Sequence, residues 1–257
     1  MEIKNRNVLI TGANRGIGLG IAKMCAQQGA KLHLVLRHPD DALKAQLINL
    51  GAQAVLVYTA DLSQRESVTQ LLTQLDKIPL DILINNAGLL TGGLIEGQPV
   101  DDIYAMFQVN LLSLIQLTRG ILPGMVERKC GKIINNASVS AVMHLPCAST
   151  YAASKAAVMA FTNCIEAELK ETGVSTLCLI TPGIKTRMFD EIAVKYGKNL
   201  DVPQDSIGPD EYAQRIRKAI EDDESYLLPT GATAVGLAVS RYLPALFRWG
   251  VGRRFHR

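Results

Sequence analysis

Short apolar segments alternate with longer amphipathic segments along most of this chain. The apolar segments, rich in β-branched residues, predict strands at 7–11, 31–36, 54–58, 81–85, 132–136, 175–180 and 225–228. The longer segments have helical periodicity and predict helices at 16–28, 40–50, 64–76, 100–128, 150–171, 209–221 and 241–249. The run Val8-Leu9-Ile10 has no polar alternation, which is typical of a strand covered on both faces. The pattern therefore predicts an α/β fold, with a parallel sheet and helices on both of its faces.

Composition and charge indicate one globular domain spanning 1–257. Hydrophobic residues make up 48% of the sequence and charged residues 20%, which is ample for a large core, and no linker or repeat interrupts the pattern. The net charge of +3 is too small to indicate nucleic-acid binding. The charge is unevenly spread, because residues 225–257 contain five arginines and no acid, which leaves −2 on the rest of the chain.

Cysteine and histidine usage argues against disulfides and a metal site. The five cysteines are odd in number and form no C-x-x-C, which is typical of free thiols in a reducing compartment. The four histidines have no metal-ligand spacing. No signal-peptide pattern precedes the first strand and the late apolar run ends at Arg241, so we expect a cytoplasmic protein without a spanning helix.

A glycine-rich turn joins the first strand to the first helix. It reads Thr11-Gly12-Ala13-Asn14-Arg15-Gly16-Ile17-Gly18. Glycines allow a tight turn and a close approach of backbone to a pyrophosphate, and a helix N-terminus offers N–H donors and a positive dipole end. The spacing G-x-x-x-G-x-G differs from the usual dinucleotide fingerprint, and an ordinary glycine-rich turn is the alternative. The strand–turn–helix context favours a dinucleotide site.

The end of the second predicted strand indicates which dinucleotide binds. An NAD site places an acid there to bind the ribose 2′-hydroxyl, whereas this sequence continues Leu36-Arg37-His38. Arg37, flanked by Arg15 of the glycine turn, is suited to a 2′-phosphate, so we expect NADP(H) rather than NAD(H). Asp40 comes later and marks the start of the next helix.

Asp61 and Leu62 follow the third predicted strand. The Asp61 carboxylate is placed to accept a hydrogen bond from the adenine amino group of a bound dinucleotide. It is equally suited to cap the helix that begins near residue 64, as is Ser63. The sequence supports the two interpretations of Asp61 equally.

A tyrosine–lysine pair lies at the start of the helix predicted at 150–171. Of the seven tyrosines, Tyr151 is the one with a lysine four residues later, so Tyr151 and Lys155 share a helix face. A nearby ammonium lowers the pKa of a phenol, which makes it a proton donor and acceptor usable near neutral pH. A surface pair is the alternative for this spacing alone. Ser138 and the run Asn85–Gly88 follow two other predicted strands, where open α/β sheets bind ligands.

Together these motifs resemble the short-chain dehydrogenase/reductase family. The motifs T-G-A-N-R-G-I-G, N-N-A-G, Ser138, Y-A-A-S-K and Pro182-Gly183-Ile184-Lys185-Thr186 occur in the family's order, and the resemblance covers roughly residues 5–221. It implies a single Rossmann-type, doubly wound parallel sheet of about seven strands. It also implies an NADP(H)-dependent oxidoreductase that transfers a hydride between the cofactor and a carbonyl or secondary alcohol.

The resemblance gives four residues a catalytic role. It implies that Tyr151 donates a proton to the carbonyl oxygen in reduction and removes it in oxidation. It implies that Lys155 lowers the tyrosine pKa and binds the nicotinamide ribose, while Ser138 hydrogen-bonds the substrate oxygen. Asn110 matches the family's asparagine that holds a proton-relay water; taken alone, it is a polar residue in a long helix. The cofactor-binding residues expected from the motifs and the resemblance are Thr11, Gly12, Asn14, Arg15, Gly16, Ile17, Gly18, Arg37, Asp61, Leu62, Asn86, Gly88, Tyr151, Lys155, Pro182, Gly183, Ile184 and Thr186.

The segment 188–208 is predicted to be a substrate lid. Its apolar residues, Met188, Phe189, Ile192 and Tyr196, indicate a partly hydrophobic ketone such as an acyl, steroid-like or aryl ketone. Some members of the family reduce β-ketoacyl groups on an acyl carrier protein and carry basic residues at the ends of both long helices. Arg128 and Lys129 fit this pattern at the first helix, but Glu171-Thr172 does not fit at the second.

Three other functions compete with an oxidoreductase. A hydrolase on an α/β sheet needs a G-x-S-x-G elbow, which the sequence lacks. A sugar-nucleotide epimerase would have G-x-x-G-x-x-G and a larger C-terminal part. A non-catalytic NADPH-binding sensor or scaffold would bind the cofactor without needing Tyr151, Lys155 and Ser138 together, and NADPH oxidation with a panel of ketones distinguishes it from an enzyme.

The residues 230–257 form an apolar and basic tail that departs from the family. Many members end in a strand followed by an Asp-Gly-Gly turn that packs tetramers, whereas here Thr230-Gly231-Ala232 follows the last predicted strand. We therefore expect a homodimer through the helices 100–128 and 150–171 rather than a tetramer.

Within the tail, the spacing predicts one amphipathic helix near 241–251. Its apolar positions are Leu243, Leu246, Phe247 and Gly250, at i, i+3, i+4 and i+7. Arg241 and Arg248 share the opposite side, and Pro244 suits the first turn. The apolar stripe either packs on the domain or a dimer mate, or lies on an anionic membrane surface.

Overall fold

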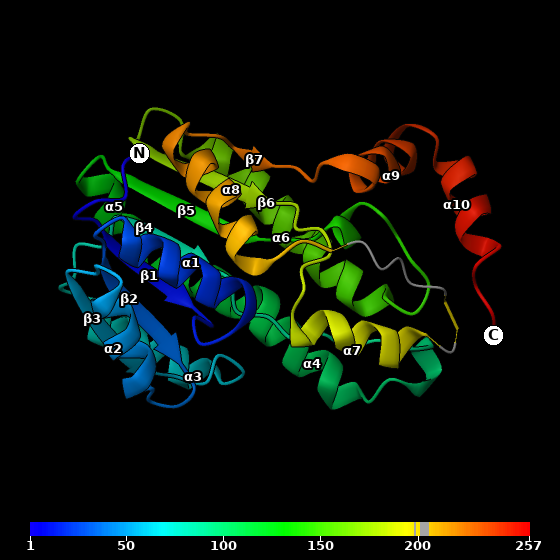
Figure 1. The fold of residues 1–257 in the computed structure, drawn as a ribbon, viewed down its shortest axis with the longest axis horizontal. Helices are drawn as coiled ribbons and strands as arrows, with labels where there is room; N and C mark the ends of the chain where they lie inside the picture. The colour runs from blue at the N-terminus through cyan, green and yellow to red at the C-terminus, as the bar shows by residue number, and fades with distance from the viewer. Residues whose placement is uncertain (198, 201–205) are drawn as a thin grey trace.

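The computed structural model describes residues 1–197, 199–200 and 206–257. Within these residues, seven strands form one parallel sheet in the order β3-β2-β1-β4-β5-β6-β7 (Figure 1). The strands are β1 (Asn7–Thr11), β2 (Lys31–Leu36), β3 (Ala54–Thr59), β4 (Ile82–Asn85), β5 (Gly131–Asn136), β6 (Val174–Leu179) and β7 (Tyr226–Leu227). The order confirms the Rossmann-type, doubly wound sheet, and it places the switch in winding direction between β1 and β4.

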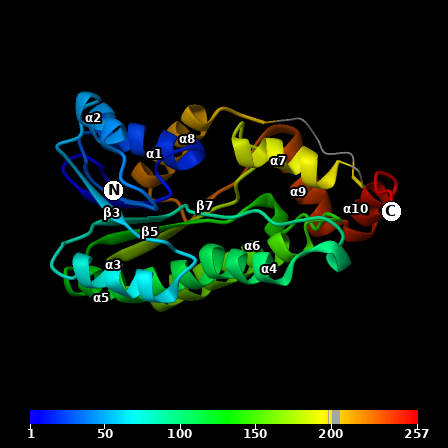
Figure 2. The ribbon, with the colours of Figure 1, turned by 90° about the horizontal axis from the view of Figure 1, so that it is seen from below.

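Helices cover both faces of the sheet (Figure 2). One face carries α1 (Gly16–Gln27), α2 (Asp41–Asn49) and α8 (Pro209–Glu221). The other carries α3 (Arg65–Leu75), α6 (Ser149–Glu168) and a continuous run made of α4 (Val100–Phe107), the π-helix η2 (Gln108–Leu112) and α5 (Ser113–Glu127). Beyond the carboxyl ends of the strands lie α7 (Arg187–Tyr196), α9 (Gly231–Tyr242) and α10 (Pro244–Gly252), and short 3₁₀ turns occupy η1 (Ile95–Gly97) and η3 (Val139–Ala141).

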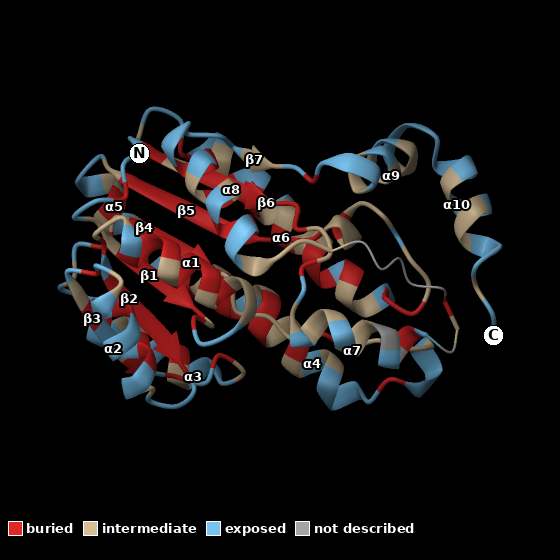
Figure 3. Cartoon of the chain, viewed as in Figure 1, coloured by how far each residue is buried: buried red, intermediate tan, exposed pale blue. Residues whose placement is uncertain are grey.

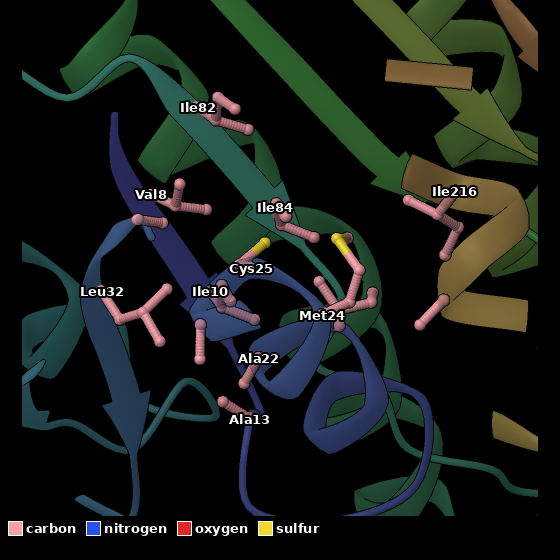
Figure 4. Packing of buried hydrophobic residues seen from close by; sticks show 14 of the residues in the cluster. Val8, Ile10, Ala13, Ala22, Met24, Cys25, Leu32, Ile82, Ile84 and Ile216 are labelled. Carbon is pink, nitrogen blue, oxygen red and sulfur yellow. The ribbon is translucent and has the colours of Figure 1, made fainter. Parts of the chain in front are cut away.

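The central strands are buried on both faces because they carry apolar residues at successive positions (Figure 3). Val8 and Ile10 pack in the cluster beneath α1 and α8, while Leu9 between them packs with residues of α3 and α5. This alternation follows from the two-residue repeat of a strand. Figure 4 shows the first cluster, where Met24 of α1 and Ile216 of α8 lie near the strand residues. The rigid sheet between two helix layers fixes the positions of the loops at its carboxyl end.

Strand boundaries agree with the sequence patterns to within one residue at each end. The helix predicted at 100–128 is interrupted at Gln108–Leu112 by the π-helix, which the periodicity did not indicate. The predicted lid 188–208 contains the helix α7, and its residues 198 and 201–205, which include Pro203, lie outside the described part of the chain. The helix α9 was not predicted, because its mixture of glycine, alanine and threonine has no strong apolar stripe.

The prediction of one helix at 241–249 is wrong, since the tail forms two helices that meet at Leu243 and Pro244. Leu243 has φ −130° and ψ 56°, which is not helical. The residue before a proline is disfavoured in the α conformation, and Pro244 is instead the first residue of α10. Arg241 and Arg248 therefore belong to different helices and do not share one face.

The continuous helical run Val100–Glu127 is long and apolar enough to cross a membrane by length and composition, and it is the one such run among the described residues. Its Leu117 and Met125 side chains are fully buried against the sheet layer that also contains α3. One side of this run therefore packs in the core of the protein.

Candidate active site

The switch point between β1 and β4 is closed by hydrogen bonds from the loop after β4. The Thr11 hydroxyl at the end of β1 accepts from the backbone N–H groups of Asn86 and Ala87, at 3.0 and 2.9 Å. The Asn86 side-chain amide donates back to the carbonyl oxygens of Thr11, at 3.0 Å, and Gly12, at 3.3 Å. The sequence singled out Thr11, Gly12 and Asn86 as cofactor residues, and the structure brings them together at the crevice where open α/β sheets bind nucleotides.

The glycine turn has the geometry of a phosphate cradle. Gly12 and Gly16 have φ of +67° and +54°, which favour glycine. A Cβ on Gly18 would lie 2.1 Å from the Gly12 carbonyl oxygen, so this glycine allows α1 to pack directly on the turn. The N-cap of α1, Arg15, has no side-chain cap, and Asn14 beside it is exposed. A helix N-terminus of this kind fits a pyrophosphate, as the sequence predicted for a dinucleotide.

Arg37 and Arg15 follow the adjacent strands β2 and β1, and both are exposed. Neither guanidinium forms an ion pair within the described residues. Beyond β3, the pKa of the Asp61 carboxyl is lowered by hydrogen bonds from the Ser63 backbone and hydroxyl and, to a smaller extent, by the charge of Arg37. Basic side chains therefore border this corner of the site.

Asp61 does not cap α3. Its carboxylate accepts from the backbone N–H and the hydroxyl of Ser63, at 2.9 and 2.8 Å, and the N-cap residue Gln64 has no side-chain cap. The capping interpretation is therefore wrong for both Asp61 and Ser63. Leu62 is buried in the core with α3, so any contact it makes with a cofactor would come through its backbone. Asp40 does cap α2, since its carboxylate accepts from Leu43 N–H at 2.9 Å.

The structure brings Ser138, Tyr151 and Lys155 together beyond the end of β5. Ser138 is the N-cap of η3, and Tyr151 and Lys155 lie on successive turns at the start of α6. The Ser138 hydroxyl and the Tyr151 phenol are hydrogen-bonded. The Lys155 ammonium nitrogen lies 5.9 Å from the centre of the Tyr151 ring and is buried. A hydroxyl, a phenol and an ammonium at one strand end form a site able to donate a proton to an oxygen.

Burial controls the protonation of this group. It raises the pKa of Tyr151 to about 12, and the hydrogen bond with Ser138 lowers that pKa only in part. Burial also lowers the pKa of Lys155 to about 8. The expected lowering of the tyrosine pKa by Lys155 is not a feature of this arrangement, because burial dominates the shift and Ser138 is the group that lowers it. The Lys155 ammonium instead donates to the Asn136 carbonyl oxygen at 2.7 Å. In this state the phenol holds its proton at neutral pH.

Asn136 is a positioning residue that the sequence patterns did not reveal. Besides its carbonyl bond to Lys155, its side-chain amide donates to the Asn86 oxygen at 3.2 Å and its own oxygen accepts from Thr181 at 2.6 Å. It therefore connects the catalytic group to the switch point and to the loop after β6. The pair Asn135-Asn136 at the end of β5 was the available signal, but the motifs drew attention to Ser138, two residues after Asn136.

Asn110 lies in the π-helix η2, inside the molecule. Its side-chain oxygen accepts from Leu89 N–H at 2.8 Å, and its amide donates to the Leu89 carbonyl and the Ser154 hydroxyl, at 3.0 and 3.1 Å. A π-helix inserts an extra residue and often occurs at functional sites. Gly88 lies beside it, because a Cβ there would be 3.4 Å from the Asn110 oxygen and 3.8 Å from the Lys155 nitrogen. Gly88 therefore lies next to both Asn110 and Lys155.

The loop after β6 connects the catalytic group to the glycine turn. Its residues Pro182 and Gly183 are half-buried, and Ile184 is buried and forms a β-bridge with Ile207. Thr186 contacts the turn, since a Cβ on Gly16 would lie 3.1 Å from its methyl group. Ile17 of the turn is half-buried against the core of the α1 face. The five-residue motif therefore begins beside Thr181, which bonds to Asn136, and its last residue borders both the cradle and the lid helix α7.

Apolar side chains form the wall beside Tyr151. The cluster contains Leu90, Cys147, Ala148, Tyr196 and Leu200, with Leu94, Leu145, Met188, Ile192 and Phe255 packed against it. Tyr196 of α7 donates to the Thr91 carbonyl at 3.1 Å, which connects the lid to the loop after β4. Phe255 comes from the tail, and its participation was not predicted. The candidate substrate space is therefore bordered by three segments that are far apart in the sequence. No group of three or more metal-ligating side chains occurs in the described residues.

The buried Lys155 gives a stability prediction with a defined pH dependence. In the unfolded chain Lys155 has its ordinary pKa of 10.5, whereas in the folded protein its pKa is about 8. The buried charge therefore lowers the free energy of unfolding most below pH 8, where the lysine is charged in both states. We expect Lys155→Met to raise the free energy of unfolding by about 1–3 kcal/mol at pH 7, with the gain shrinking between pH 8 and 10.5. Urea unfolding at pH 7 and pH 9.5 measures this.

Lys132→Met is the matched control. Lys132 is also fully buried, but its ammonium pairs with Asp223 at 2.6 Å. Its removal leaves that carboxylate without its partner, so we expect this variant to lose stability. An equal change for Lys155→Met at both pH values would contradict the assigned cost of the buried charge.

Comparisons with known proteins identify the family of this chain. The family model described as short chain dehydrogenase matches residues 6–197. A fatty acyl-CoA reductase of Acinetobacter baylyi is 34% identical and covers 85% of this chain and 74% of its own length. A 3-oxoacyl-[acyl-carrier-protein] reductase of Synechocystis sp. is 35% identical, over 72% of this chain and 76% of its own. A short-chain dehydrogenase of Sphingobium yanoikuyae in complex with NADPH has a TM-score of 0.82 at 25% identity, covering 98% of this chain and 97% of that one.

The matched range contains the switch point, the cradle and the catalytic group, and it ends within the lid. It covers well over half of the sequence. The chain is therefore a member of the short-chain dehydrogenase/reductase family of oxidoreductases.

Proposed function

We propose that this protein is an NADP(H)-dependent oxidoreductase that interconverts a partly hydrophobic ketone and its secondary alcohol. The observation that carries the proposal is the hydrogen bond between buried Ser138 and half-buried Tyr151, next to Lys155 and against an apolar wall. A phenol that keeps its proton at neutral pH is ready to donate it to a carbonyl oxygen.

Each residue of the group has a distinct task in this mechanism. The Ser138 hydroxyl hydrogen-bonds the substrate oxygen and holds it beside the phenol. Tyr151 donates its proton to that oxygen in reduction and accepts it in oxidation. Lys155, anchored on the Asn136 carbonyl, would bind the nicotinamide ribose beside the phenol. For Asn110, which is buried and bonded to Ser154, the proposed role is the one that the family resemblance implies, to hold a water that relays the proton.

The cradle fits the dinucleotide. Backbone N–H groups at the start of α1 would hold the pyrophosphate, and Arg37 with Arg15 would hold a 2′-phosphate. Thr186, Ile184 and Gly88 border the space between the cradle and Tyr151. When bound, NADPH supplies the hydride that adds to the carbonyl carbon. Two solved relatives at 25% identity are described as complexes with NADPH and NADP, which supports this cofactor.

An acyl or aryl ketone fits the apolar wall. Relatives named as acyl-carrier-protein and acyl-CoA reductases support an acyl carbonyl. A carrier-protein partner is less well supported, because the Arg128 guanidinium already donates to the Leu80 carbonyl at 2.7 Å. The second long helix ends near Glu171, which is acidic. We therefore propose that the substrate is either a free ketone or a ketone carried on a small-molecule thioester, rather than one bound to a carrier protein.

A substrate screen tests the function. The purified protein is incubated with NADPH and a panel of aryl, cyclic and β-ketoacyl ketones, and NADPH consumption is followed by its absorbance. We expect turnover with one or more hydrophobic ketones. Saturable NADPH binding with no turnover on any ketone or, in reverse, on any alcohol would favour the non-catalytic sensor instead.

Cofactor preference gives a separate prediction. We expect a lower KM for NADPH than for NADH, and in Arg37→Asp an increase in the NADPH KM of about 10- to 100-fold, the range for losing a charge-assisted hydrogen bond. The NADH KM should fall or stay unchanged, because a carboxylate suits the ribose 2′-hydroxyl. Arg119→Asp is the control, since Arg119 is exposed on α5, away from the cradle. Equal use of NADH by the wild type would overturn the assignment of Arg37.

We also propose a homodimer through α5 and α6. Leu112 is exposed at the start of α5, and the outer side of α6 exposes small residues such as Ala153, Ala160 and Ala167. Small side chains allow two helices to approach closely. The mass of the protein in solution, by light scattering, tests this.

A further inference from the structure

The tail exposes a group of large apolar side chains on its outer surface. These are Tyr242, Leu243, Leu246 and Trp249, here called the tail patch, and each is more than half exposed. They lie at the end of α9, in the turn, and one helical turn apart on α10. Soluble proteins rarely expose several large apolar side chains so close together without a partner.

The tail packs against the rest of the protein, so the tail patch is exposed on a segment that has fixed contacts. The Ser240 hydroxyl of α9 donates to the Val142 carbonyl at 2.9 Å, and Leu237 packs with the cluster beneath α6. Past α10, Phe255 forms a β-bridge with Leu200, and Arg257 pairs with Glu96 at 2.7 Å. Contacts at both ends hold α9 and α10 at the end of the molecule that carries the carboxyl ends of the strands (Figure 1).

Basic side chains surround the tail patch. Arg241 lies over the Tyr242 ring at 5.7 Å, and Arg253 lies over the Trp249 ring at 5.0 Å. Arg254 is exposed beside them, and the segment 225–257 contains no acid. Apolar side chains with tryptophan and tyrosine among arginines are typical of a surface that lies in the headgroup region of a bilayer.

We propose that the tail patch docks on an anionic lipid bilayer. Both the charge and the side-chain types match that surface, since apolar burial and attraction of arginine to anionic headgroups act together. A second copy of the chain is a poorer match. A two-fold contact would press the patch on itself and bring two acid-free, arginine-rich segments together.

The docking surface lies next to the substrate space. Phe255, a few residues beyond α10, packs against the cluster that contains Tyr151 and the lid. A groove of about 530 Å³ between α10 and α6, lined by Phe255, Leu145 and Arg248 among others, opens beside the same cluster. A bilayer at the tail patch would therefore face the side from which an apolar ketone enters. This consequence rests on the proposed function, whereas lipid binding itself does not.

Vesicle binding tests the proposal with the full-length protein. Trp249 is the single tryptophan of the sequence, so its fluorescence reports the patch directly. We expect sedimentation with phosphatidylglycerol vesicles at low salt and a blue shift of the tryptophan emission. Both signals should be weak with phosphatidylcholine vesicles, and both should weaken near 1 M salt, where charges are screened beyond about 3 Å.

Two variants and two controls separate the contributions. Leu246→Ser should weaken binding about tenfold through lost apolar burial, and Arg253→Gln with Arg254→Gln should weaken it about thirtyfold, at roughly fivefold for each arginine. Tyr104→Ser and Arg119→Gln change an exposed aromatic and an exposed arginine elsewhere and should leave binding unchanged.

Three outcomes would overturn the proposal. The first is no sedimentation of the wild type with phosphatidylglycerol vesicles at low salt. The second is equal loss of binding in the patch variants and the controls. The third is a tryptophan emission that is blue-shifted without vesicles and moves to the red on dilution, together with a lower mass in solution for Leu246→Ser than for the wild type. That result would assign the tail patch to contact with a second copy of the chain. Turnover of a soluble ketone is measured in parallel, so a failure of the proposed function is seen separately.

Discussion

Tyr151→Phe is expected to lower kcat by at least about a hundred- to ten-thousand-fold while NADPH still binds. In the proposed mechanism the phenol hydroxyl is the proton donor, and phenylalanine keeps the ring but not the proton. The variant loses the hydrogen bond between the hydroxyl and Ser138, so the free energy of unfolding should change by about 1 kcal/mol. Steady-state kinetics with the best ketone and a binding titration with NADPH measure the two effects.

Tyr196→Phe is the matched control for this prediction. Tyr196 is buried in the same cluster, and its hydroxyl donates to the Thr91 carbonyl rather than to a substrate. We expect it to change KM, through the lid, with kcat within about tenfold of the wild type. Activity of Tyr151→Phe within tenfold of the wild type would refute the assignment of the proton donor.

Gly18→Ala is expected to destabilise the fold by about 3 kcal/mol or more, although alanine normally favours a helix over glycine by about 1 kcal/mol. The new methyl group would lie 2.1 Å from the Gly12 carbonyl oxygen and 2.5 Å from the Asn86 amide. Because the first of these is backbone, α1 must move away from the turn. The cradle should distort as well, with weaker NADPH binding. Urea unfolding and a cofactor titration measure both.

Gly250→Ala provides the comparison, because a methyl group on Gly250 in α10 meets no atom within 4 Å. There the helix propensity should act alone and leave the stability unchanged or raised by up to about 1 kcal/mol. If Gly18→Ala is as stable as the wild type, the glycine is not needed for packing of the helix on the turn.

The sequence predicted best what depends on strands and on motifs adjacent to them. A parallel sheet brings all strand carboxyl ends to one edge, so the glycine turn, Asn86, Ser138 and Thr186 had to lie near one another once the strands were placed. Tyr151 and Lys155 are brought together by helix spacing alone. These predictions needed only local geometry and the sheet.

The contacts that the sequence did not reveal are tertiary. Asn136 binds Lys155 through a carbonyl, a group that every residue has, so no side-chain pattern marks it. The π-helix at Asn110 depends on its bonds to Leu89 and Ser154, which are distant in sequence. The break at Pro244 was misread because the apolar spacing continues across it, although the conformation of Leu243 does not.

The attachment of the tail to the lid has a genetic consequence. The family match ends at residue 197, and the contact between Leu200 and Phe255 lies beyond it. The residues of the candidate catalytic group are thus separate along the chain from those that border one side of the candidate substrate space. Under the proposed function, Phe255→Ala should leave the catalytic group intact and broaden the range of accepted ketones. A codon change at Phe255 would then alter the substrate range without altering the proposed reaction.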